Sequence, residues 1–86
     1  MTSSEADLAR KILELCALRG PGKTICPSEV ARAIASDETT WRAMMPKVRE
    51  VAATLVRKHR IVAFQKGVSV DPKSAGGTIR LGLPEN

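Results

Sequence analysis

The sequence predicts an α+β domain in which the long helices come before the two wing strands. Apolar residues recur at helical spacing before residue 60. Residues 61–64 read Ile-Val-Ala-Phe and stop at Lys66-Gly67, and residues 78–83 alternate apolar and polar side chains, as in half-buried strands. A helix that ends in basic residues and passes at once into a strand and a glycine turn is typical of a winged helix-turn-helix. We predict that fold, with three to four helices and a small antiparallel β-sheet wing.

A first helix is predicted over residues 4–19 of a single domain that covers residues 1–86. Leu8, Ile12 and Leu15 give this helix one apolar stripe, and a Gly-Pro pair ends it. Both Thr2 and Ser4 have capping-box spacing to an acidic residue. The sequence therefore leaves two possible starts for this helix, one after Thr2 and one after Ser4.

A short strand at residues 24–25 and a second helix over residues 27–35 are predicted next. Pro27 suits the first helical position, where its missing N–H costs nothing. Glu29 stands two residues later, at the spacing from which a carboxylate reaches back to the backbone of Cys26. We expect the strand to pair with the wing.

A third helix is predicted over residues 46–59, after a short helical turn at residues 40–45. We place the start of the long helix at Pro46, because proline is tolerated in the first turn of a helix. One continuous, kinked helix from Thr40 is the alternative. The long helix has an apolar stripe formed by Val48, Val51, Ala52 and Leu55.

Two wing strands are predicted at residues 61–65 and 78–83, with Ile79, Leu81 and Leu83 facing the core. The segment between them contains an Asp-Pro pair and three glycines. Glycine and proline interrupt regular structure, so we expect a flexible wing over residues 65–78.

Charge is the main functional signal of the sequence. The net charge is +5, yet residues 42–80 alone hold nine Lys and Arg against two acids. A winged helix meets phosphates with this region. Aromatic residues make up 2% of the chain, which is too few for a platform that stacks the bases of single strands. A double-stranded nucleic acid is therefore the partner that we expect; we favour DNA, and the sequence leaves the choice between DNA and double-stranded RNA open.

The outward side of the third helix is predicted to hold Glu50, Ala53, Thr54 and Arg57. Thr54 could touch a base edge, and basic side chains suit phosphates or guanine. Glu50 counts against DNA binding, because it would face a polyanion. The candidate nucleic-acid-binding residues are Lys47, Arg49, Thr54, Arg57, Lys58, Lys66 and Lys73.

A second hypothesis is a protein-interaction module that docks through Trp41, Met44 and Met45. Methionine-rich apolar surfaces suit adaptable partners, which here would be another protein or a second copy of the chain. Burial of Trp41 would remove the anchor of this surface.

We expect no enzymatic activity, no catalytic residues, no cofactor and no metal. One His and two Cys cannot form an ordinary structural zinc site. Cys26 stands at a helix start, a setting of reactive thiols, but we favour a capping role for it. The sequence has no apolar run of membrane-spanning length and starts with polar residues, so we expect a soluble cytoplasmic protein.

Five segments carry a resemblance to a known family: residues 25–33, 41–46, 65–67, 70–72 and 79–81. Through them the chain resembles a family of small, uncharacterised bacterial proteins, a domain of unknown function whose members fold as winged helices. The resemblance covers about residues 12–83 and implies the fold, but it leaves the biochemical role open. The chain has Val68-Ser69 where members often have a basic residue and Pro. It has Lys58-His59-Arg60 where a Gly usually turns the helix into the strand, which would leave His59 in a left-handed conformation.

Overall fold

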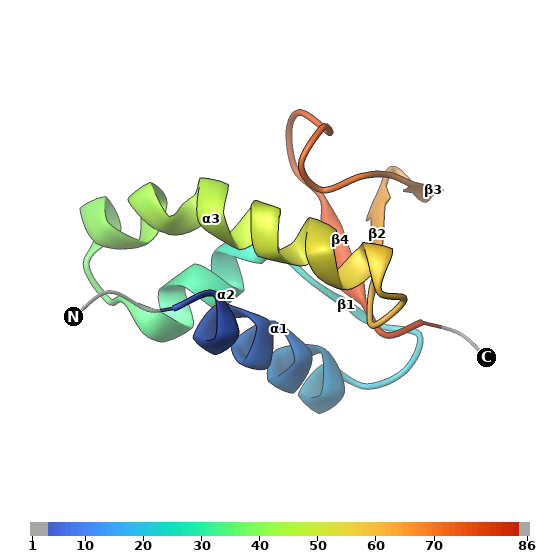
Figure 1. Cartoon of the computed structure of the whole chain (residues 1–86), viewed down its shortest axis with the longest axis horizontal. Helices are drawn as coiled ribbons and strands as arrows, with labels where there is room; N and C mark the ends of the chain where they lie inside the picture. Colours follow the sequence, from blue (N-terminus) through green and yellow to red (C-terminus); the bar gives the residue numbers. More distant parts are fainter. Residues whose placement is uncertain (1–3, 85–86) are drawn as a thin grey trace.

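A computed structural model describes residues 4–84, which form three helices and a four-stranded antiparallel sheet (Figure 1). The predicted α+β class is confirmed, and the arrangement is consistent with that of a winged helix. The elements follow in the order α1 (Glu5–Arg19), β1 (Thr24–Ile25), α2 (Pro27–Ile34), α3 (Glu38–Arg57), β2 (Val62–Gln65), β3 (Val68–Ser69) and β4 (Arg80–Gly82).

The sheet has the strand order β1-β4-β2-β3, so that β4 lies between β1 and β2. Leu81 is opposite Ile25 on one side and opposite Ala63 on the other. The expected pairing of residues 24–25 with the returning wing strand is therefore confirmed. The sheet lies at one end of the molecule, beside the carboxyl ends of α1 and α3 (Figure 1).

The core is aliphatic, as the low aromatic content requires. Each of the three helices gives it apolar side chains, for example Ile12, Val30 and Val48, which are fully buried. Of the three residues predicted to face inward in the returning strand, Ile79, just before β4, and Leu81 are fully buried, and Leu83 is half-buried against the core. The largest buried side chains are Leu8, Ile12, Ile25, Ile61, Ile79 and Leu81.

Helix α1 begins at the second of the two predicted caps. The Ser4 hydroxyl accepts a hydrogen bond from the backbone N–H of Asp7 at 3.1 Å, and the Asp7 carboxylate accepts one from the N–H of Ser4 at 3.3 Å. The latter bond lowers the pKa of Asp7 below its ordinary value. The other predicted cap, Thr2, lies outside the described residues.

Helix α3 runs without interruption through Pro46. The prediction of a short turn at residues 40–45 and a separate helix from Pro46 is therefore wrong, and the alternative of one long helix is correct. Asp37 caps this helix by accepting from the backbone N–H of Thr40 at 3.0 Å. Proline removes one intrahelical bond, to the carbonyl of Arg42. Because Pro46 is exposed, water can hydrate that carbonyl, and the helix continues.

The end of α3 is a Schellman motif with His59 at the position that glycine usually occupies. His59 has a φ of 58°. The N–H of His59 bonds to the carbonyl of Val56 at 3.0 Å, and the N–H of Arg60 bonds to that of Leu55 at 2.9 Å. The left-handed conformation implied for His59 is confirmed, and it turns the chain from α3 directly into β2.

The wing is more ordered than predicted. Val68–Ser69 forms strand β3, which pairs with β2 through a tight turn at Lys66 and Gly67. Both turn residues have positive φ, 52° and 80°, as tight hairpin turns require. The flexible wing expected over residues 65–78 is thus wrong for this hairpin, and the loop after it is fixed by side-chain contacts described below.

Gly82 offers a test of the sheet register. A Cβ at this position would lie 2.9 Å from the carbonyl oxygen of Lys23, which is backbone and cannot easily move. We expect Gly82→Ala to lower the free energy of unfolding by about 1–3 kcal/mol, as overpacking does. Chemical denaturation measures the change. Gly76→Ala is the matched control, because a Cβ there meets nothing within 4 Å, and equal losses for both variants would contradict the register.

Candidate nucleic-acid interface

Lys47 is balanced by two carboxylates. Its ammonium nitrogen lies 3.6 Å from Glu5 of α1 and 3.7 Å from Glu50, one turn further along α3. The start of α1 therefore lies beside the outward side of α3 and brings an acid to it. Glu50 is exposed, as predicted, but it faces a positive charge of its own helix.

Arg49 is bound to the loop that follows β3. Its guanidinium donates to the carbonyl oxygens of Ala75 at 2.6 Å, Pro72 at 3.4 Å and Gly77. The side chain is half-buried, so its donors are directed at backbone oxygens of the protein itself. One turn later on the same side of the helix, Ala53 is 1% exposed, and its predicted outward position is wrong. The loop narrows the face of α3 that solvent can reach.

Thr54 and Arg57 are brought together. The Thr54 hydroxyl donates to the carbonyl of Glu50 at 3.3 Å and accepts from the Arg57 guanidinium at 3.1 Å. Thr54 also lines a hollow between α1 and α3, together with Lys58 and Glu5. With both roles of its hydroxyl in use, Thr54 is poorly suited to read a base edge.

Five basic side chains in residues 57–73 are exposed and form no ion pair within the described part of the chain. One of them, Arg60, is not among the residues predicted from the sequence, although it continues the basic run at the end of α3. Lys66 stands at the hairpin turn, and Lys73 lines a hollow with Arg49 and Glu50. We call these residues the basic set: Arg57, Lys58, Arg60, Lys66 and Lys73.

The alternative docking surface is partly engaged in the fold. Trp41, Met44 and Met45 are half-buried and pack against the core. Two guanidinium groups lie over the Trp41 ring, that of Arg32 at 5.6 Å and that of Arg42 at 5.1 Å from its centroid. These cation–π contacts cover an aromatic ring that would otherwise anchor a partner.

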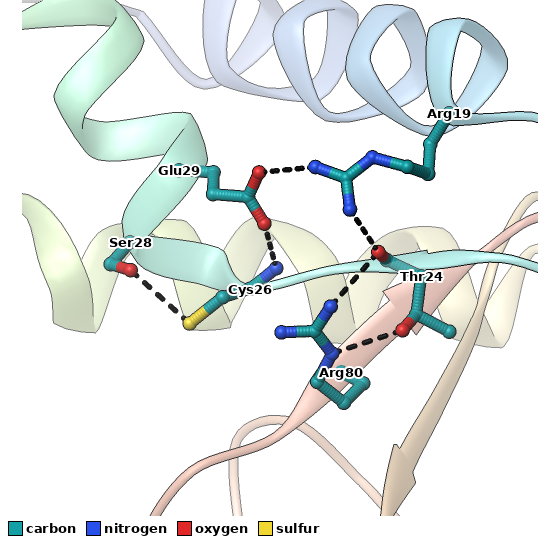
Figure 2. Close-up of polar contacts among 6 residues, drawn as sticks. All are labelled: Arg19, Thr24, Cys26, Ser28, Glu29 and Arg80. Carbon is teal, nitrogen blue, oxygen red and sulfur yellow. Dashed lines mark hydrogen bonds and ion pairs between the residues drawn. The ribbon is translucent and has the colours of Figure 1, made fainter.

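Cys26 belongs to a polar network that joins α1, β1, α2 and β4 (Figure 2). The Glu29 carboxylate accepts from the N–H of Cys26 at 2.7 Å and from Arg19 at 2.6 Å, so the predicted reach of Glu29 to this backbone is confirmed. Arg19 and Arg80 both donate to the carbonyl of Thr24 at 3.0 Å. The network ties the edge strand β1 to the helices, which is a structural role.

The two cysteines are free thiols in different surroundings. Cys16 is buried in the core, and burial raises the pKa of its thiol. Cys26 is half-buried, and its sulfur accepts a hydrogen bond from the Ser28 hydroxyl at 3.2 Å. Within residues 4–84, no three His, Cys, Asp or Glu side chains are grouped so that they could hold a metal ion.

Fold and surface together define a small α+β domain with exposed basic residues at the end of α3 and on its hairpin. The model of a family described as "Protein of unknown function (DUF3253)" matches residues 5–84, and the chain belongs to this family. The expected membership of an uncharacterised domain family is thereby confirmed. No curated protein matches the chain. None of the helices in the described residues is both long and apolar enough to cross a membrane.

The Glu29 carboxylate gives a pH-dependent prediction. The hydrogen bond from the N–H of Cys26 lowers its pKa below the ordinary 4.5, against the effect of burial and with help from Arg19. A carboxylate with a lowered pKa in the folded state stabilises the fold fully above its unfolded pKa. This contribution is lost as pH falls through the folded pKa. We expect Glu29→Gln to cost about 1 kcal/mol at pH 7 and clearly less near pH 3, measured by urea unfolding.

Glu38→Gln is the control for this measurement. Glu38 forms an exposed pair with Arg42, whose contribution to stability is expected to be small. A loss for Glu29→Gln that stays the same from pH 7 to pH 3 would contradict the assignment.

Proposed function

We propose that this domain is a winged-helix module that binds double-stranded DNA through its phosphates, as a small regulator or accessory protein. The observation that carries the proposal is the basic set: five exposed side chains, close together in sequence, that no carboxylate of the described residues neutralises. Lysine and arginine contacts to phosphate supply most of the affinity of a protein for DNA of any sequence.

The distribution of ion pairs supports this location. Basic residues of α1 pair with nearby acids, as Arg10 does with Asp7 and Lys11 with Glu14. Arg42 pairs with Glu38 in the first turns of α3. Most of the exposed basic side chains without an ion pair in the described residues therefore lie at the end of α3 and in the wing, where they would attract a polyanion. Lys23, Arg32 and Arg80 are the exceptions elsewhere on that surface.

The same surface offers little for reading bases. Specific readout needs side-chain donors and acceptors that reach base edges in a groove. On α3, Arg49 and Thr54 are engaged by the protein itself, and Glu50 places a carboxylate on the outward side. We infer that binding is governed by charge and shape, with little dependence on sequence.

The docking surface of Trp41, Met44 and Met45 is the weaker candidate. A docking anchor has to be accessible, and these side chains are half-buried, with two arginines on the indole. A protein partner remains the outcome to pursue if the wild type fails to bind duplex DNA at low salt.

A salt titration tests the proposal. We expect the wild type to bind a short duplex of mixed sequence, with an affinity that falls steeply between about 50 and 200 mM salt. Replacing Arg57, Lys58 and Lys66 by Gln should lower the affinity and reduce the log–log slope by about 2.7, because each phosphate contact contributes about 0.9. Fluorescence anisotropy with labelled DNA measures both quantities.

The matched control replaces Arg10, Lys11 and Arg42 by Gln. It removes the same number of positive charges, but from residues that are paired with carboxylates outside the basic set. Its slope should stay close to that of the wild type. Equal losses in the two triple variants would show that net charge alone, and not this surface, governs binding.

A further inference from the structure

The loop between β3 and β4 is held by two side chains from elsewhere in the fold. Arg49 of α3 donates to the carbonyls of residues 72, 75 and 77. Gln65 of β2 donates to the carbonyl of Thr78 at 3.4 Å and to that of Gly76. Side-chain hydrogen bonds thus hold the loop against α3 and β2. In a longer wing hairpin, backbone hydrogen bonds between paired strands would do this. In Figure 1 it is the orange segment that returns beside α3.

The first part of this loop forms a compact turn around Lys73. The Asp71 carboxylate accepts from the N–H of Lys73 at 2.9 Å, and the Asp71 carbonyl accepts from the N–H of Ala75 at 2.9 Å. Pro72 is fully buried. The backbone of Lys73 is therefore fixed on both sides, while its side chain is exposed.

Arg49 is what connects this turn to the helix. Two of its bonds go to Pro72 and Ala75, which flank Lys73 in the turn. Arg49 and Lys73 also line the same hollow, with Met45, Pro46 and Glu50. Without the guanidinium, three carbonyls would lose a donor, and the turn would lose its main polar link to α3.

We propose that Arg49 is a positioning residue, which holds the loop on α3 so that Lys73 contacts a DNA phosphate. This inference rests on the proposed function. Arg49 itself donates to carbonyls and does not contact the phosphate. The alternative is that Arg49 leaves the loop and binds a phosphate directly, as predicted from the sequence.

A double-mutant cycle on the full chain separates the two roles. Lys73→Ala should reduce the log–log salt slope of duplex binding by about 0.9, the contribution of one phosphate contact. Arg49→Lys keeps the positive charge, but a single ammonium cannot replace the fork of a guanidinium on three carbonyls. We expect Arg49→Lys to lower the slope by the same amount as Lys73→Ala, and the double variant to lower it no further.

A direct phosphate contact by Arg49 gives a different pattern. Arg49→Lys would then keep the wild-type slope, and Arg49→Ala combined with Lys73→Ala would lower it by about 1.8, since independent contacts add. Either result overturns the positioning role while leaving DNA binding intact. A wild type that binds no duplex at low salt overturns the proposed function, and this inference with it.

Hydrogen exchange supplies a readout that does not depend on DNA. The amides of Ser74 and Ala75 bond to the Asp71 carbonyl, and they should exchange faster in Arg49→Lys than in the wild type. Arg42→Lys is the matched control, because Arg42 lies on the same helix and makes no bond to the loop. Unchanged exchange in Arg49→Lys, in a variant whose thermal unfolding shows it to be folded, would overturn the positioning role.

Discussion

The pairing of β4 with both β1 and β2 is the constraint on which the rest of the structure depends. It seats Ile79 and Leu81 in the core and connects the segment before α2 to the segment after α3. Because β2 lies between β3 and β4 in the sheet, the chain that connects β3 to β4 must pass β2. That return brings the loop against α3, where Arg49 binds it.

Elements with a local signal could be predicted from the sequence. The cap at Ser4 and the reach of Glu29 follow from residue types a few positions apart. The left-handed His59 was expected from the family resemblance, because it stands where members usually have Gly. Pro46 misled the prediction for a local reason as well. A proline marks the start of a helix only where nothing else stabilises helical turns before it. Here the cap at Asp37 and the packing of Met44 stabilise the turns that precede Pro46.

The candidate site was harder to predict, because it depends on contacts between distant segments. Nothing near Arg49 in the sequence shows that residues 72–77 will meet it. The same holds for Lys47, whose partner Glu5 belongs to another helix. Helical periodicity assigns a side chain to a face, but it cannot show which other segment covers that face. Exposed basic residues of the hairpin, such as Lys66, lie as expected because little else reaches them.

The formal charge of α3 therefore differs from the charge of those side chains that a partner in solution can reach. The third helix is basic in composition, yet Lys47 is balanced by carboxylates and Arg49 faces carbonyl oxygens. What remains lies at the carboxyl end of α3, where cations also interact favourably with the helix dipole. A positive patch in that position is compatible with helix stability, whereas the same charges at the other end of the helix would oppose it.

Trp41, which is in cation–π contact with Arg32 and Arg42, is also an intrinsic fluorescent probe of the fold. The chain has one Trp and no Tyr, so its intrinsic ultraviolet emission comes from a single indole. That indole contacts side chains of both α2 and α3, and it therefore registers whether these two helices stay together. Separation of α2 from α3 can thus be followed by the fluorescence of the unlabelled protein, and release of the loop by amide exchange.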